Sequence, residues 1–163
     1  MTVPLQSALD ICTNCSGKGV LYDSRVEVGR YGKLRICDCV QADCLCRGEN
    51  PYQYWDQSSR LQWCPCGAAR RRLLKIQKLF KQSDVPAKYR WKFQDDFSMQ
   101  TPDGEPIPIA AEGRGYVSTL VDGDKEPRRG FVLFGSPGTG KTLLGCIMLN
   151  ELILHRARAG MFL

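Results

Sequence analysis

Eight of the nine cysteines fall within residues 12–66, and this pattern constrains the fold more than any other feature. They form four close pairs: Cys12/Cys15, Cys37/Cys39, Cys44/Cys46 and Cys64/Cys66. The first residues lack the basic start and following apolar run that are typical of a secretory signal. We therefore expect a cytoplasmic protein whose thiols stay reduced. Paired thiols in such a compartment indicate metal, and eight thiolates suit two tetrahedral, structural zinc sites.

Residues 1–66 hold too little aliphatic material for a large core, and domains of this size usually need metal or other staples. A structural zinc ion can supply about 10–16 kcal/mol of folding free energy. Sequential pairing (first pair with second, third with fourth) and interleaved pairing both stay open. Two alternatives to zinc also stay open, namely ordinary reduced thiols at the third and fourth pairs and an iron–sulfur cluster. Cys146 is expected in the core of a later helix.

The excess of positive charge lies in one segment. The net charge is +6, and residues 67–98 hold nine basic and three acidic residues, while the remainder of the chain is balanced. Apolar residues at helical spacing predict a helix over residues 68–82. Its basic side, a candidate contact for a phosphate backbone, consists of Arg70, Arg71, Lys75, Lys78 and Lys81. Such a stripe is typical of nucleic-acid binding, although a solvated helix face has the same composition.

Three aromatic residues follow the basic helix, and they allow two interpretations. Tyr89, Trp91 and Phe93 could stack on unpaired bases, or they could pack in a core. Downstream, residues 101–129 are rich in Gly and Pro and predict mostly loop, with one short helix over residues 109–121. No run reaches the roughly 18 apolar residues of a membrane-spanning helix, so we expect no membrane association.

A phosphate-binding motif, G-x-x-x-x-G-K-[ST], is matched without exception. Its residues are Gly135, Ser136, Pro137, Gly138, Thr139, Gly140, Lys141 and Thr142. The apolar run at residues 131–134 predicts a strand of a parallel sheet before it, and residues 141–159 predict a helix after it. Backbone N–H groups and Lys141 would bind the phosphates of ATP, and the Thr142 hydroxyl would bind Mg²⁺. Residues 161–163 predict the start of a second strand.

Two short motifs carry resemblances to known families. Cys12-Thr13-Asn14-Cys15-Ser16-Gly17-Lys18-Gly19 resembles half of a DnaJ-type zinc knuckle. Val85-Pro86-Ala87-Lys88-Tyr89-Arg90, then Phe93-Gln94-Asp95-Asp96-Phe97 and the phosphate loop, together resemble the bacterial replicative helicase-loader (DnaC-like) family and the related IstB-like transposition helper ATPases. The resemblance covers most of residues 67–163.

This resemblance implies an AAA+ ATPase that uses ATP, Mg²⁺ and Zn²⁺, with a replicative helicase and single-stranded DNA as partners and with self-association as in AAA+ rings. The fold class expected is a zinc-stabilised module at residues 1–66, a basic helix and linker at 67–98, and the first part of an α/β P-loop domain with an incomplete parallel sheet at 99–163. Family members continue through Walker B, sensor and arginine-finger segments, so we expect a truncated form without ATP hydrolysis of its own.

Two alternatives stay open. The chain could be a zinc-dependent adaptor whose ATPase part is vestigial, or a P-loop NTPase or kinase of another family that carries a zinc appendage. The first alternative shares the cysteine module and the basic helix with the helicase-loader hypothesis, and it differs in having no functional nucleotide site.

Overall fold

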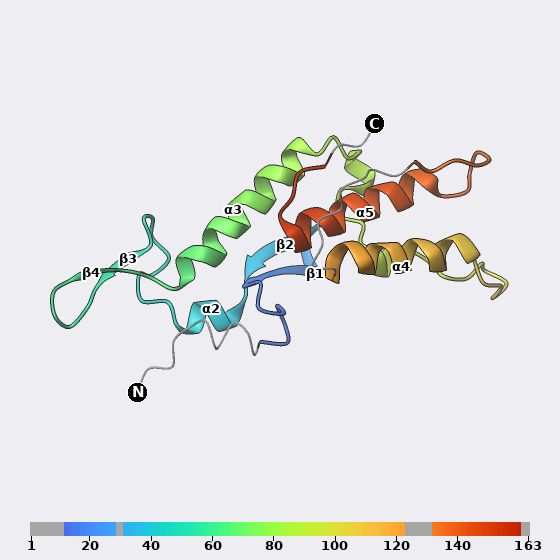
Figure 1. Ribbon diagram of the computed structural model, residues 1–163. Coiled ribbons are helices and arrows are strands. Elements are labelled where there is room, and N and C mark those ends of the chain that lie inside the picture. The colour runs from blue at the N-terminus through green and yellow to red at the C-terminus, as the bar shows by residue number, and fades with distance from the viewer. Residues whose placement is uncertain (1–11, 29–30, 123–131, 161–163) are drawn as a thin grey trace. The chain divides into compact units, whose positions relative to one another are not determined.

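The computed structural model describes residues 12–28, 31–122 and 132–160 (Figure 1). The chain divides into two units, Met1–Gln77 and Lys78–Leu163, and each is described here by itself. The domain boundaries after residues 66 and 98 stay predictions. None of the described helices is long and apolar enough to cross a membrane.

In its described residues the first unit contains two antiparallel hairpins and two helices. Strands β1 (Val20–Val28) and β2 (Tyr31–Ile36) form the first hairpin, and the short helix α2 (Asp38–Ala42) follows it. Strands β3 (Gln53–Trp55) and β4 (Leu61–Trp63) form the second hairpin. Helix α3 (Cys66–Gln82) then begins in this unit and continues into the second.

Cysteines occupy much of the interior of the first unit. Among the residues whose burial is described, the buried aliphatic side chains of this unit are Val20, Leu34, Ile36 and Val40 and, on α3, Ala69 and Ile76. Five of the eight paired cysteines are buried with them, namely Cys15, Cys37, Cys46, Cys64 and Cys66. The sparse apolar core fits the expectation that this unit needs a further source of stability.

Helix α3 begins two residues before its predicted start and ends where the apolar spacing predicts. Its buried side carries Ile76 and Phe80, and four basic side chains are exposed: Arg71, Lys75, Lys78 and Lys81. The helix ends because the chain turns at Asp84, whose φ is +52°, and because Val85 precedes a proline. The Ser83 hydroxyl also donates to the Phe80 carbonyl at 3.1 Å.

The second unit is helical in its described residues. It contains the 3₁₀ helices η1 (Ala87–Tyr89) and η2 (Gln94–Asp96) and the α-helices α4 (Pro108–Asp122) and α5 (Lys141–Arg156). Helices α4 and α5 lie side by side (Figure 1) and share a core of Val117, Leu144 and Met148. The predicted helices at 109–121 and 141–159 thus form with small shifts of their ends.

A buried polar contact fastens the linker segment to α5. The Asn150 side-chain amide donates to the carbonyl of Tyr89 at 2.7 Å and to that of Lys92 at 2.8 Å. One turn onward, the Glu151 carboxylate accepts the backbone N–H of Gln94 at 2.8 Å. The Tyr89 carbonyl also accepts the backbone N–H of Lys92 at 3.1 Å, so the Asn150 amide adds a second bond there. Through these bonds α5 fixes the course of the segment.

The predicted α/β architecture with an incomplete parallel sheet is wrong. Among the described residues each sheet is a two-stranded antiparallel hairpin, and no parallel pair occurs. Residues 132–134 form no strand, and Val132 and Phe134 are 85% and 92% exposed instead of buried on both faces. The physical reason is that a parallel strand needs neighbours for its backbone groups, and none is present in the described chain. Phe131 and residues 161–163 lie outside the described residues.

Candidate metal centres

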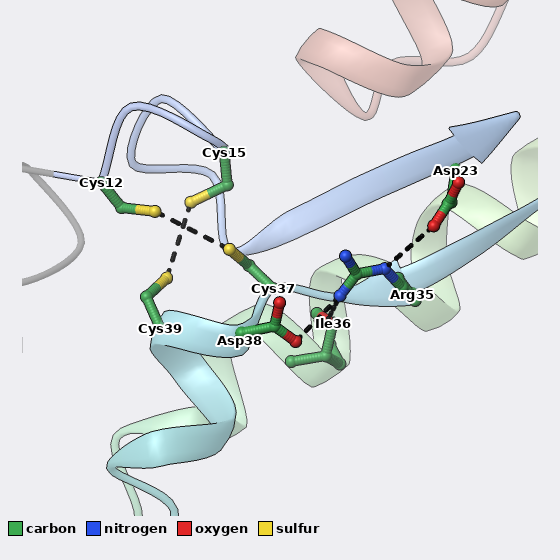
Figure 2. Close-up of polar contacts among 8 residues, drawn as sticks. All are labelled: Cys12, Cys15, Asp23, Arg35, Ile36, Cys37, Asp38 and Cys39. Atoms are coloured by element: carbon green, nitrogen blue, oxygen red, sulfur yellow. Dashed lines mark hydrogen bonds and ion pairs between the residues drawn. The ribbon is translucent and has the colours of Figure 1, made fainter. Parts of the chain in front are cut away.

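The first centre, here called tetrad 1, consists of Cys12, Cys15, Cys37 and Cys39. The β1–β2 hairpin assembles it, because the pairing of Val20 with Ile36 brings the turn before β1 beside the start of α2. Figure 2 shows the four thiols pointing toward one another, with 3.7 Å between Cys12 Sγ and Cys37 Sγ and 3.7 Å between Cys15 Sγ and Cys39 Sγ. The Cys37 N–H also donates to the Gly19 carbonyl at 2.9 Å.

Glycines and an ion pair hold the frame of tetrad 1. Gly17 and Gly19 have φ of +72° and +70°, a conformation that costs glycine little, so the chain can fold back after Cys15. Arg35 on β2 donates to the Asp38 carboxylate at 2.9 Å and lies 3.6 Å from that of Asp23 on β1 (Figure 2). Asp38 separates Cys37 from Cys39, so this contact ties α2 to the hairpin.

The second centre, tetrad 2, consists of Cys44, Cys46, Cys64 and Cys66. The loop after α2 supplies the first two thiols, and the end of the β3–β4 hairpin and the start of α3 supply the others. The Cys44–Cys66, Cys46–Cys66 and Cys44–Cys46 sulfurs are 3.5, 3.4 and 3.9 Å apart. The pairs are therefore grouped sequentially, first with second and third with fourth, which settles the choice that the spacing left open.

The sulfur positions fit one tetrahedral ion in each tetrad. A Zn–S bond of about 2.3 Å places tetrahedral sulfurs about 3.8 Å apart, close to the distances found. A disulfide would need about 2.05 Å, and all nine cysteines are free thiols. Within each tetrad the ligand atoms lie within 4.8 Å of one another. That spread suits a single ion better than a cluster of several irons, which holds its thiolates further apart.

Backbone hydrogen bonds favour the thiolate form of one cysteine in each tetrad. A hydrogen bond with the backbone of Cys15 and, to a smaller extent, one with the Cys39 thiol lower the pKa of Cys12 to about 7. Burial raises the pKa of Cys64, but hydrogen bonds from the backbone at Cys66, Leu45 and Cys46 outweigh it and lower that pKa to about 7. Burial raises the pKa of Cys39 and of Cys66. Full ionisation of such a tetrad therefore needs a cation at its centre.

Arg70 lies against tetrad 2. Its Nε–H donates to Cys66 Sγ at 3.3 Å, and an Nη lies 3.8 Å from Cys44 Sγ. Its guanidinium covers Gly48, where a Cβ would come within 2.7 Å of it. Arg70 was expected in the nucleic-acid stripe, but it contacts the sulfurs of tetrad 2 instead. The signal was present, since Arg70 follows Cys66 by four residues and so shares its helix face.

The remaining basic residues of the stripe do lie on the surface. Arg71, Lys75, Lys78 and Lys81 are exposed on α3. Two of the three aromatic residues downstream pack against other side chains, because the Trp91 ring lies 4.8 Å from that of Phe80 and Phe93 is buried. Core packing is thus the interpretation that fits Trp91 and Phe93.

The phosphate-loop residues form an exposed turn ahead of α5. Gly135, Gly138 and Gly140 have φ of +145°, +83° and +79°, and Gly140 caps the helix. The Lys141 ammonium donates to the carbonyls of Gly135 and Ser136 at 2.8 and 2.6 Å and lies 3.2 Å from Thr139 Oγ1. Thr139 also donates to Ser136, while Pro137 and Thr142 are exposed. The lysine thereby ties the first residues of the loop to its last.

Comparisons with protein-family models, with curated proteins and with solved structures found no match to this chain. The likeness to helicase loaders and transposition helpers therefore rests on the short motifs alone. The feature that the structure itself supports is the pair of four-cysteine centres near the N-terminus.

Proposed function

We propose that residues 12–66 fold around two structural zinc ions, one in each tetrad, and that the resulting module is a binding adaptor. One observation carries this proposal: in each tetrad the four sulfurs lie within 4.8 Å of one another, at distances that suit a tetrahedral ion. Four protein ligands fill the coordination sphere of zinc, so no position is left for a reacting molecule. The role of each ion is then to stabilise the fold, since catalytic zinc keeps an open site.

Energetics supports a metal-dependent fold. The described part of the first unit buries six aliphatic side chains, and two-stranded hairpins are marginal in water without further support. Zinc binding of about 10–16 kcal/mol per ion exceeds the whole stability of a typical small domain. Because the unfolded chain holds no preformed site, this binding energy acts as folding energy, and the module is expected to unfold when zinc is removed.

Metal analysis of cysteine variants tests the proposal. The purified chain is expected to carry two zinc ions, Cys15→Ser to lose the ion of tetrad 1, and Cys64→Ser to lose that of tetrad 2. Cys146→Ser is the matched control, since Cys146 is buried in α5 and belongs to neither tetrad. Less than one zinc per chain, or an equal loss in the Cys146 variant, would contradict the proposal.

A second function, nucleotide binding of the helicase-loader type, is favoured by the conformation of the phosphate loop. Its three glycines adopt positive φ, which lets the backbone curve around a phosphate group. Lys141 has three N–H donors, and two of them serve loop carbonyls. We propose that the third, now directed at Thr139, binds a β- or γ-phosphate oxygen of Mg²⁺-bound ATP, and that Thr142 contacts the Mg²⁺.

The biological setting of this second function follows from the resemblance. In the helicase-loader interpretation the chain acts with a replicative helicase on single-stranded DNA. An IstB-like transposition helper is the alternative setting, with DNA as the shared partner. An adaptor without nucleotide remains the simplest competitor, and the nucleotide experiment separates it from both.

Calorimetry with Mg²⁺-ATP tests the second function. Lys141→Ala removes one charge-assisted hydrogen bond, worth about 1.5–3 kcal/mol, so affinity should fall by roughly 10- to 150-fold. Lys75→Ala is the matched control, because it removes the same charge from an exposed position on α3. Equal affinities of wild type and Lys141→Ala, or no binding by either, would leave the adaptor as the function.

A further inference from the structure

The β3–β4 hairpin carries an exposed aromatic face. Trp55 pairs with Leu61 and Gln53 with Trp63, and side chains alternate along a strand, so these four residues share one face. Trp55 is 69% exposed, Trp63 65% and Leu61 50%. Large apolar side chains gathered on one exposed face are a mark of binding surfaces in soluble proteins.

The hairpin presents this face on a fixed backbone. In its turn, the Asp56 carboxylate accepts the N–H groups of Ser58 and Arg60, both at 2.9 Å, and the Gln62 amide at 3.2 Å. At its base, the N–H of Cys64 donates to the Tyr52 carbonyl at 2.7 Å, next to tetrad 2. The acidic side chain of the turn is thus engaged within the hairpin, and it also lies 3.8 Å from the Arg60 guanidinium, whose side chain is 74% exposed.

Basic residues adjoin the hairpin. A Cβ on Gly67 would lie 3.2 Å from Arg71 Nη1 and 3.2 Å from Tyr52 Cβ, so the start of α3 lies against the base of β3. Arg71 and Lys75 are exposed four residues apart, on one face of that helix. Along β3 runs an open groove of about 670 Å³, whose lining includes Leu45, Arg47, Glu49, Gln53, Tyr54 and Trp55.

We propose that this surface, made of the Trp55–Trp63 face, the groove along β3 and the basic start of α3, binds single-stranded DNA. Exposed indoles offer π-faces for unpaired bases, and arginine and lysine offer contacts for the backbone. Trp55 and Trp63 occupy diagonal positions of the hairpin, which are about 7–8 Å apart in antiparallel sheets, so both indoles are within reach of the same short stretch of bases. The choice of DNA rests on the proposed helicase-loader setting.

Aromatic and basic groups together favour a nucleic acid over a protein partner. An apolar protein surface would match the two tryptophans, but it would gain nothing from Arg71 and Lys75. A strand of DNA uses both features, since its bases stack and its phosphates release counterions on contact with cations.

The test uses the full, zinc-loaded chain with Trp91→Phe, which leaves Trp55 and Trp63 as the only tryptophans. Titration with an oligothymidylate of about 15 nucleotides should quench their fluorescence and raise the anisotropy of a labelled oligomer. Alanine at both Trp55 and Trp63 should weaken binding by about tenfold or more for each ring. Tyr116→Ala, an exposed aromatic on α4, is the matched control and should bind as before.

Metal content separates this inference from the zinc proposal. Two zinc ions in the double alanine variant, together with lost DNA binding, support the surface, because the module is then intact. Unchanged DNA affinity in that variant overturns it, as does binding without any tryptophan quenching. Tighter binding of the matching RNA oligomer overturns the choice of DNA. The inference is also overturned if the wild-type chain self-associates, the double variant is monomeric, and neither form binds DNA. The face would then be a contact between copies of this chain.

Discussion

Arg70 should stabilise the metal of tetrad 2 and leave that of tetrad 1 unchanged. Four thiolates around Zn²⁺ carry a net charge of −2, and the Arg70 guanidinium is the cation that contacts two of these sulfurs. The contact to Cys66 Sγ at 3.3 Å lies within the range of a charge-assisted bond to sulfur, whereas the 3.8 Å contact to Cys44 Sγ is weaker. One bond to a charged group is worth about 1.5–3 kcal/mol.

This free energy corresponds to roughly a 10- to 150-fold loss of zinc affinity in Arg70→Ala. Loss of an outer partner of a metal ligand typically costs 10- to 100-fold, so the two magnitudes agree. Competition with a chromophoric chelator measures the effect, and tetrad 1 in the same molecule serves as internal reference. Arg71→Ala is the matched control. Arg71 follows Arg70 on α3, is exposed, and makes neither of the two sulfur contacts that Arg70 makes.

Arg70→Lys distinguishes charge from packing. A lysine keeps the positive charge and loses the planar fork, so it should restore part of the affinity that alanine loses. Equal zinc release from Arg70→Ala and Arg71→Ala would show that the Arg70 guanidinium does not stabilise the metal of tetrad 2. So would an equal loss from both tetrads, because that result would show a general loosening of the fold.

Two further predictions concern single hydrogen-bonded side chains. Backbone N–H groups lower the pKa of Asp56 in the hairpin turn, so its ionised form stabilises the turn above the usual carboxyl pKa, and this stability is lost as pH falls through the lowered pKa. The amide NMR signals of the turn should therefore shift below about pH 4. Asp56→Asn should abolish this pH-dependent shift. Asn150→Ala removes the amide that donates to the carbonyls of Tyr89 and Lys92, so it should lower the free energy of unfolding of the second unit by about 1–3 kcal/mol, measured by urea denaturation. Gln82→Ala, at an exposed position at the end of α3, is the control and should change this free energy little.

Local signals in the sequence predicted local structure well. The apolar spacing located helices α3, α4 and α5 within a few residues, because helical periodicity depends only on neighbouring turns. The cysteine spacing predicted two four-thiol centres, and their close approach is confirmed. Their grouping was not predictable, because it depends on the β1–β2 pairing that brings Cys12 to Cys37, and such pairing is a long-range property.

Predictions that needed distant partners fared worse. The run at residues 131–134 has the composition of a buried strand, but a strand forms only when another strand pairs with it, and the described chain supplies none there. The exposed face of Trp55 and Trp63 was missed because its strands have three residues each, too short for a periodic signal. The contact of Arg70 with Cys66 could have been predicted from their spacing of four residues on one helix, whereas its contact with Cys44, 26 positions away, could not.

X-ray absorption at the zinc edge of the purified full chain would identify the ligands of both tetrads. We expect two zinc ions per chain, each with four sulfur ligands at about 2.3 Å and no metal–metal distance. Nitrogen or oxygen in the first coordination sphere would contradict this account, because it would mean that at least one thiol of a tetrad is not a ligand. An iron–iron distance from a bound cluster would contradict it as well.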